Sequence, residues 1–194
     1  MINKKIEANF RESIAVKEKT LLSNHRLIGR AADAIIKVFK KNKKILFFGN
    51  GGSAADSQHI AAEFIGRFQL ERKSLPAIAL TTDTSILTAL GNDYNFDIIF
   101  ARQIEGLGQK GDIAFGISTS GNSRNVIAGI KKANAMGLKT ISLTGHGGGE
   151  LARVSQMSMI VPSNNTARIQ ESHLCILHTL CQLVEESLFS KKSR

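Results

Sequence analysis

The chain has 194 residues, of which 42% are hydrophobic, and a formal net charge of +10 at pH 7. This length and composition predict one domain, residues 1–194, with an ordinary buried core, and no apolar run approaches the roughly 20 residues that span a membrane. Because the N-terminus lacks the apolar segment of a signal peptide and the two cysteines, Cys175 and Cys181, give no disulfide framework, we expect a reduced cytoplasmic protein.

Residues 3 to about 39 have the apolar spacing of an amphipathic helix. Ile6, Phe10 and Ile14 recur at intervals of four residues, and no proline interrupts the stretch. The segment Thr20–Asn24 predicts a break, so we expect two helices before the rest of the domain. A helical extension of this kind often packs against a partner subunit, and we therefore expect an oligomer.

From about residue 44 to residue 161, short apolar runs alternate with helical patterns, and we expect this region to form the sheet core. Runs that are apolar on both faces are typical of parallel strands covered by helices on two sides. We therefore expect an α/β fold, with a doubly wound parallel five-stranded sheet in three layers and a C-terminal helix over about residues 166–188. The predicted strands are Ile45–Phe48, Ala77–Leu80, Ile113–Ile117, Thr140–Leu143 and Met157–Val161.

Two of the predicted strands end in loops suited to an anion. Gly49–Ser53 follows the first strand, and Ser118–Ser123 follows the third; a helical pattern begins after each loop. A helix N-terminus presents free backbone N–H groups and the positive end of the helix dipole. Ser118–Ser123 adds four hydroxyls, which is more than helix capping requires, so we favour a phosphate cradle over a capping turn. Two such loops suggest a phosphorylated ligand at the carboxyl edge of the sheet.

Candidate acid/base groups follow these loops. His59 and Glu63 lie four residues apart on one face of a predicted helix. Such a pair is more often a surface contact. Because this helix begins at the first ligand loop, however, a functional role is favoured here. A lone histidine among apolar residues, such as His178, is more often part of the core. The C-terminal helix supplies Gln170, Glu171, His173 and His178.

The positive charge gathers in two clusters, Lys40–Lys44 and Lys191–Arg194. Basic clusters favour either a nucleic-acid partner or a solvated surface that attracts small anions. Nucleic-acid sites usually add aromatic or groove-reading side chains, and the chain has one tyrosine and no tryptophan. We therefore favour the solvated surface and expect no nucleic-acid or membrane partner.

Five motifs lie in order along nearly the whole chain: Gly49–Ser53, His59-x-x-x-Glu63, Gly91–Asp93, Gly116–Ser123, and Ala167–Glu171 followed by His178. Their order and spacing closely resemble those of the phosphoheptose isomerases, members of the sugar isomerase (SIS) fold family. The resemblance is far more specific than any single loop. It implies a SIS fold and a cytoplasmic homotetramer with sites at its subunit interfaces.

The resemblance also implies a reaction, the interconversion of sedoheptulose 7-phosphate and D-glycero-D-manno-heptose 7-phosphate, which feeds ADP-heptose and lipopolysaccharide core synthesis. Glu63 and His178 would be the catalytic acid/base pair. One zinc ion per subunit would bind His59, Glu63, Gln170 and His178. At Ala167, where some members carry Asp, the chain departs from the pattern. Substrate contacts would come from Asn50, Gly51, Gly52, Glu63, Asn92, Asp93, Ser118, Thr119, Ser120, Ser123 and Gln170, with the four hydroxyl residues of this set on the phosphate.

Aldose–ketose isomerisation moves a proton between C1 and C2 through an enediol. One carboxylate, Glu63, can take the proton from one carbon and return it to the other, and His178 could shuttle the oxygen-bound proton or open the sugar ring. Zinc would polarise the carbonyl as a Lewis acid. The roles of Glu63 compete, because a carboxylate bound to zinc is a weaker base.

The spacing of Gln170 and His178 limits how one metal ion can bind both. Eight residues correspond to roughly 12 Å along a straight helix and an angular offset of about 80°. A single ion could then bridge them only with both side chains fully stretched. We therefore predict either a helix break between them or a site built from two subunits.

Two other functions are compatible with this fold family. One is a non-catalytic SIS-fold protein that binds the replication initiator, which would suit a basic surface. That relative has non-catalytic residues at the positions of Glu63 and His178, and Gly51–Ser53 also follows the isomerase form here. The other is an isomerase of a pentose or hexose phosphate. The presence of both Glu63 and His178 favours an enzyme over a binding protein.

Overall fold

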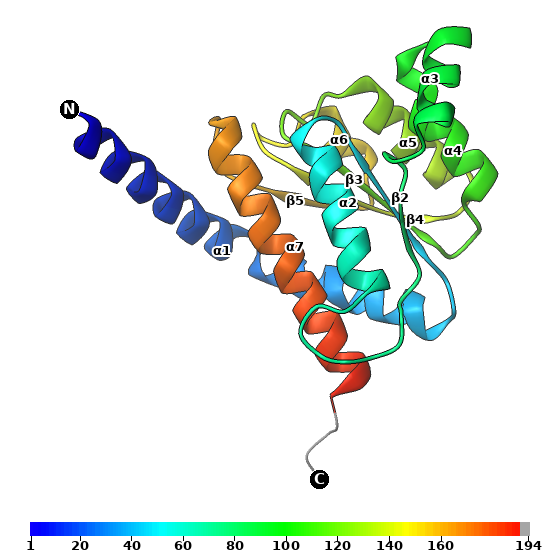
Figure 1. Ribbon diagram of the computed structural model, residues 1–194, viewed down its shortest axis with the longest axis horizontal. Helices are drawn as coiled ribbons and strands as arrows, with labels where there is room; N and C mark the ends of the chain where they lie inside the picture. The colour runs from blue at the N-terminus through cyan, green and yellow to red at the C-terminus, as the bar shows by residue number, and fades with distance from the viewer. Residues whose placement is uncertain (191–194) are drawn as a thin grey trace.

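One sheet of five parallel strands organises the computed structural model, which describes residues 1–190 (Figure 1). Each pair of neighbouring strands runs parallel. The predicted α/β fold with a five-stranded parallel sheet is therefore confirmed. In sheet order the strands are β2 (Ala77–Ala79), β1 (Ile45–Gly49), β3 (Ile113–Ser118), β4 (Lys139–Thr144) and β5 (Met157–Ile160).

The strand order changes direction at β1, which has β2 on one side and β3 on the other. The carboxyl ends of β1 and β3 are neighbours, because Gly49 lies beside Ile117 in the register. In a doubly wound sheet, such a switch point leaves a crevice in which ligands bind. The two loops expected to bind an anion, Gly49–Ser53 and Ser118–Ser123, both begin at this edge of the sheet.

Helices cover both faces of the sheet and enclose two apolar cores (Figure 1). Along β1, Ile45 and Phe47 belong to the first core, whereas Leu46 and Phe48 belong to the second. This alternation explains why the strand is apolar on both faces. The first core lies against α1 (Ile2–Lys40), α2 (Gly52–Ile65) and α7 (Thr166–Phe189). The second lies against α3 (Thr84–Asp93), α4 (Ile99–Leu107), α5 (Arg124–Ala135) and α6 (Gly149–Val154), with a short 3₁₀ helix, η1 (Phe96–Ile98), before α4.

The predicted break at Thr20–Asn24 is wrong, because α1 is one continuous helix of 39 residues. Thr20 and Asn24 are buried, and both bond to carbonyls one turn back, those of Val16 and Thr20. The Asn24 side chain also exchanges two hydrogen bonds with the backbone of Ile160 in β5, at 2.9 and 3.0 Å. Asn24 thus satisfies the backbone hydrogen-bonding groups of Ile160 in the edge strand β5. Neither polar residue interrupts the helix.

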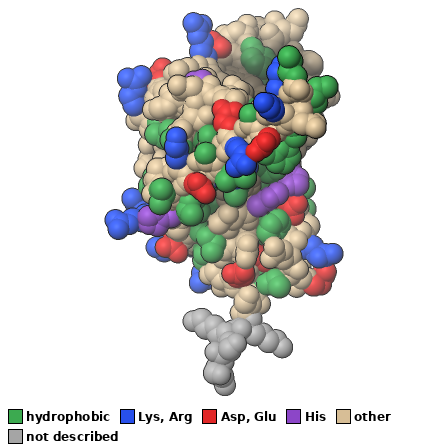
Figure 2. Space-filling view, turned by 90° about the vertical axis from the view of Figure 1, so that its left-hand side faces the viewer, with side chains coloured by type: hydrophobic (Ala, Val, Ile, Leu, Met, Phe, Trp, Pro, Cys, Tyr) green, Lys and Arg blue, Asp and Glu red, His purple; other side chains and the backbone are tan. Residues whose placement is uncertain are grey.

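The N-terminal half of α1 projects from the body of the protein (Figure 1). Ile6, Phe10 and Ile14 are 52%, 69% and 57% exposed, and their spacing of four residues places them along one side of the helix. Viewed from the side on which α1 projects, hydrophobic side chains lie between charged ones (Figure 2). None of the helices within residues 1–190 combines the length and apolarity needed to cross a membrane.

The basic cluster Lys40–Lys44 lies where α1 passes into β1, at the amino end of that strand. Lys44 forms an ion pair with the buried Asp112 at 2.7 Å, and Lys40 and Lys41 are exposed. The second basic cluster, Lys191–Arg194, lies outside the described residues. The cluster that the structure describes is therefore at the opposite end of the strands from the two loops expected to bind an anion.

Candidate active site

The glycines after β1 allow a close approach between the start of α2 and α7. Gly51 has a φ of +54°, which favours glycine. A Cβ atom at Gly52 would collide with the side-chain amide of Gln170, which rests on the first turn of α2. Asn50, Gly51, Gly52 and Gln170 are thus brought together at the carboxyl edge of the sheet, as the predicted substrate contacts require.

The hydroxyls of Ser118–Ser123 face one another and do not cap α5. The Ser118 and Ser123 Oγ atoms are 2.9 Å apart, and the Ser118 and Ser120 Oγ atoms are 3.4 Å apart. Ser123 is the N-cap residue of α5, yet its side chain makes no capping hydrogen bond. The three serine hydroxyls therefore lie close together just before α5, which supports the interpretation as an anion cradle over the capping turn.

A glycine-rich loop after β4 supports this cradle. Gly145 donates its N–H to the Thr119 carbonyl at 2.9 Å, and Leu151 donates to the Gly121 carbonyl at 2.8 Å. Gly121 has a φ of +67° and packs directly on the backbone of Gly148, which leaves no room for side chains. This loop was not predicted as part of the site, although the glycine run Gly147–Gly149 is the sequence signal of such a close approach.

Asn125 joins the two ligand loops and was also missed. Its buried side-chain amide exchanges two hydrogen bonds with that of Asn50, at 2.8 and 2.9 Å. A polar residue in the first turn of α5, directly after a hydroxyl-rich loop, is the signal that could have found it. The pair fixes the Asn50 loop relative to the cradle.

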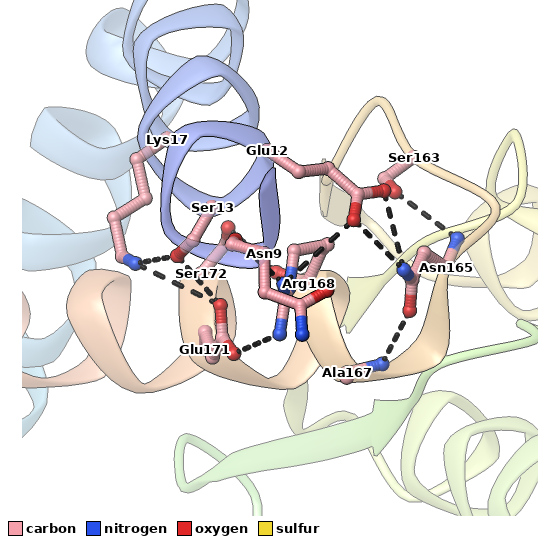
Figure 3. A network of polar contacts seen from close by, with 10 residues as sticks. All are labelled: Asn9, Glu12, Ser13, Lys17, Ser163, Asn165, Ala167, Arg168, Glu171 and Ser172. Atoms are coloured by element: carbon pink, nitrogen blue, oxygen red, sulfur yellow. Dashed lines mark hydrogen bonds and ion pairs between the residues drawn. The ribbon is translucent and has the colours of Figure 1, made fainter. Parts of the chain in front are cut away.

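The first turns of α7, which carry Gln170, are held against α1 by a polar network (Figure 3). Arg168 donates to the Asn9 carbonyl at 2.8 Å and to Glu171 at 2.6 Å. Asn165 caps the helix by accepting from the Ala167 N–H at 3.1 Å. Glu171 also accepts from the Ser13 hydroxyl of α1 and so serves this helix contact.

The acid/base candidates Glu63 and His178 meet the candidate metal ligand His59 near the other end of α2. The Nε2 atoms of His59 and His178 are 2.9 Å apart, and His59 Nε2 lies 3.5 Å from Glu63 Oε1. The Phe68 ring packs against the His178 ring, with ring centroids 5.4 Å apart. Burial, and then the neighbouring His59, lower the pKa of His178 below its ordinary value, and Glu63 opposes this shift. This environment therefore favours the neutral form of the His178 ring.

Gln170 does not join this cluster within the described chain. It contacts Gly52, whereas His178 contacts His59, so α2 and α7 run side by side in the same direction. From Gly52 to His59 is seven residues, or about 10 Å of helix. Because α7 is continuous from Thr166 to Phe189, the predicted alternative of a helix break between Gln170 and His178 is wrong.

Asn92 and Asp93 lie apart from both groups in the described chain. They form the exposed end of α3, and Asn92 donates to the Asp93 carboxylate at 2.9 Å. This helix covers the opposite face of the sheet from α2 and α7. Within residues 1–190 no hydrogen bond links either side chain to the cradle or to Glu63.

Asp56 and His173 are two further titratable groups on α2 and α7. Asp56 shares a face of α2 with Gly52 and His59, and among residues 1–190 its buried Oδ2 atom has no hydrogen-bond partner. Burial raises the pKa of Asp56 to about 6, and His59 opposes the shift. His173 is fully buried against the Thr144 carbonyl at 3.1 Å, and burial lowers its pKa to about 4, so it belongs to the core.

The donor types of His59, Glu63 and His178 fit zinc, which binds two imidazoles and a carboxylate in several enzymes. The geometry of the cluster is that of hydrogen bonding. Two imidazole donors on a tetrahedral zinc stand about 3.3 Å apart, given bonds of 2.0–2.1 Å, and the two Nε2 atoms here are at 2.9 Å. Within residues 1–190 no group of three or more His, Cys, Asp or Glu side chains is arranged as a metal site.

The fold and the cradle define a SIS-domain protein, and the model of the SIS domain matches residues 9–145. A protein of Aquifex aeolicus named phosphoheptose isomerase is 56% identical over 182 residues, covering 94% of this chain and 95% of that protein. A protein of Clostridium acetobutylicum with the same name is 50% identical, with 96% of each chain covered. The chain belongs to the phosphoheptose isomerase family, whose members are aldose–ketose isomerases.

A solved structure supports this assignment in three dimensions. The phosphoheptose isomerase of Neisseria gonorrhoeae is 42% identical and superimposes with a TM-score of 0.91, covering 96% of this chain and 100% of that one. The family resemblance identified from the sequence is thereby confirmed.

Proposed function

We propose that the chain interconverts sedoheptulose 7-phosphate and D-glycero-D-manno-heptose 7-phosphate in the cytoplasm, and thereby feeds ADP-heptose and lipopolysaccharide core synthesis. The names of its relatives support a phosphorylated heptose as substrate. The observation that carries the proposal is the convergence of Glu63, His59 and His178 in a protein that also has a hydroxyl cradle at the switch point of its sheet.

The proposed reaction divides between the two groups. The hydroxyls of Ser118, Thr119, Ser120 and Ser123 and the N–H groups at the start of α5 donate hydrogen bonds to the phosphate. The Glu63 carboxylate takes the proton from one carbon, which gives the enediol, and returns it to the neighbouring carbon. The neutral His178 ring moves the proton between the two oxygens and returns to its starting state.

We propose that a site is completed across a subunit interface of a homotetramer. The cradle lies beside the first turn of α2, whereas Glu63 lies in its last turn, eleven residues or about 16 Å further along the helix. If the cradle of one subunit lies opposite the acid/base group of its neighbour, both can contact one substrate. The distance along α2 within a single subunit then no longer keeps the two groups apart. The exposed apolar side chains of α1 supply a surface for such an assembly.

We propose further that each subunit binds one zinc ion through His59, Glu63 and His178, with Gln170 contributed from a neighbouring subunit. When bound, zinc supplies Lewis-acid polarisation of the substrate carbonyl. The residue types support this proposal, and the side chains would need to separate by a few tenths of an ångström from their hydrogen-bonded distances. Metal analysis of the purified protein, with His59→Ala as the comparison, tests the ligand set.

One assay tests the substrate and the reaction together. The purified protein is incubated with sedoheptulose 7-phosphate, with and without a chelator, and the aldose product is followed by NMR. We expect the heptose product from the native protein and none from Glu63→Gln. Turnover of a pentose or hexose phosphate alone would reassign the substrate. Binding of the sugar phosphate without any turnover would favour the non-catalytic SIS-fold alternative.

A further inference from the structure

A deeply buried ion pair lies beside the acid/base group and has no role in the mechanism above. Arg72 Nε and Glu185 Oε2 are 2.7 Å apart, and the two side chains are only 1% and 2% exposed. Burying two charges is expensive unless further hydrogen bonds satisfy them. The partners of this pair therefore indicate what it stabilises.

Glu185, on α7, holds the loop that follows α2. Its carboxylate accepts the backbone N–H groups of Phe68, Gln69 and Leu70 at 3.0, 2.7 and 2.6 Å. These are consecutive residues, so the carboxylate fixes the path of the loop. The Phe68 side chain, at the start of this segment, is the one that packs against the His178 ring.

Arg72 holds the end of α2. Its guanidinium donates to the carbonyls of Glu63 at 2.8 Å, Phe64 at 2.9 Å and Gly66 at 3.2 Å. The carbonyls of the last helical turn have no partner within the helix. Because α2 ends at Ile65, Glu63 lies in this last turn. Arg72 therefore caps the turn that carries the candidate base.

We propose that the Arg72–Glu185 pair is a positioning device for the acid/base pair, which fixes Glu63 through its helix turn and His178 through Phe68. The proposal rests on the proposed isomerase function. The pair contacts neither the cradle nor the reacting atoms, so its loss lowers the rate of the chemical step and leaves phosphate binding in place. A purely structural pair would change stability alone.

The test compares Glu185→Gln with Asp112→Asn, which weakens the Lys44–Asp112 pair at the amino end of β1. Both variants are assayed well below their melting temperatures, per folded protein. We expect kcat of Glu185→Gln to fall at least tenfold with KM within threefold, and kcat of Asp112→Asn to stay within twofold. Equal kcat values in the two variants would overturn the proposal.

A second pair of variants keeps the test decisive if Glu185→Gln does not fold. Phe68→Ala leaves the ion pair and the backbone hydrogen bonds in place, and Phe68→Tyr retains the ring. We expect kcat to fall several-fold in the first variant and to recover in the second. A kcat unaffected by Phe68→Ala would remove the link between the loop and His178.

An NMR measurement made without substrate tests the positioning role independently of the proposed isomerase function. The imidazole NMR signals of His178 should shift in Glu185→Gln and in Phe68→Ala, and stay in place in Asp112→Asn. If the native protein does not turn over the heptose phosphate but these signals shift, the proposed function fails and the positioning role stands. Unchanged His178 signals in both site-side variants would overturn the positioning role even in an active enzyme.

Discussion

The two ends of α2 differ in how completely the single chain builds the groups around them. At the start of the helix, the loops after β1, β3 and β4 are joined by the Asn50–Asn125 hydrogen bonds and by the close packing of Gly121 on the backbone of the loop after β4. Near its other end, His59, Glu63 and His178 form a small cluster that is partly open to solvent. The comparison shows that the candidate anion cradle is prebuilt by this chain alone, whereas the candidate acid/base group is left partly open to solvent.

The largest effect is expected at the open end, from Glu63→Gln. The substitution keeps the shape of the side chain and removes its capacity to take a proton, so kcat should fall by roughly 10²–10⁴. The melting temperature should change little, because Glu63 is partly exposed and its ion-pair partner His59 is exposed as well. NMR turnover assays and thermal melts check both parts, and near-native activity would show that another group is the base.

A loss of assembly should come next, from the paired substitution Phe10→Asp and Ile14→Asp on α1. Both side chains are exposed in one subunit, and charges at an apolar interface disfavour association. We expect smaller particles by light scattering and a parallel loss of turnover. Leu107→Asp, at an exposed apolar residue elsewhere, is the matched control. Small particles that keep full activity would place the complete site within one subunit.

A more modest effect is expected at the prebuilt end, from Ser120→Ala. The loss of one hydrogen bond to a charged phosphate should weaken binding by about 1–2 kcal/mol, or roughly 5- to 30-fold. This change should appear in KM and in the affinity for inorganic phosphate, with kcat little affected. An unchanged KM would indicate that the phosphate binds away from this loop.

The smallest effect is expected from Asp56→Asn, between the two ends. The folded-state pKa of Asp56, about 6, lies above the ordinary value of 3.8. Between about pH 4 and 6 the carboxyl ionises more readily in the unfolded chain than in the folded protein. The stability that Asp56 contributes is therefore fully present below about pH 4, and the free energy of unfolding falls as the pH rises through 6. Thermal melts from pH 4 to 7 should show a smaller decline in Asp56→Asn than in the native protein. Identical pH profiles would mean that this carboxyl is not perturbed.

The strands and the ligand loops could be predicted from the sequence, because their signals are local. An apolar run such as Ile45–Phe48 needs no knowledge of its neighbours, since both of its faces are buried. The hydroxyls of Ser118–Ser123 likewise come from one short segment, and Gly51 is adjacent to the loop that requires it. The same holds for His59 and Glu63, which are one helical turn apart.

The features that could not be predicted depend on contacts between distant segments. Asn24 resembles a helix breaker until β5 supplies its partner, 136 residues later. Arg72 and Glu185 are separated by 113 residues, and neither has a sequence motif. Gln170 and His178 share one helix, but the register of α7 against α2 decides that they belong to opposite ends of the site.

Mixed oligomers test most directly whether the cradle and the acid/base group of different subunits act together. Glu63→Gln and Ser120→Asp, which places a negative charge in the cradle, should each be inactive as pure oligomers. The two variants are co-expressed with different tags, and oligomers that contain both are purified. A site shared between subunits predicts that these mixed oligomers regain turnover of sedoheptulose 7-phosphate. Mixed oligomers that remain inactive, while native oligomers purified in the same way are active, would contradict the shared site.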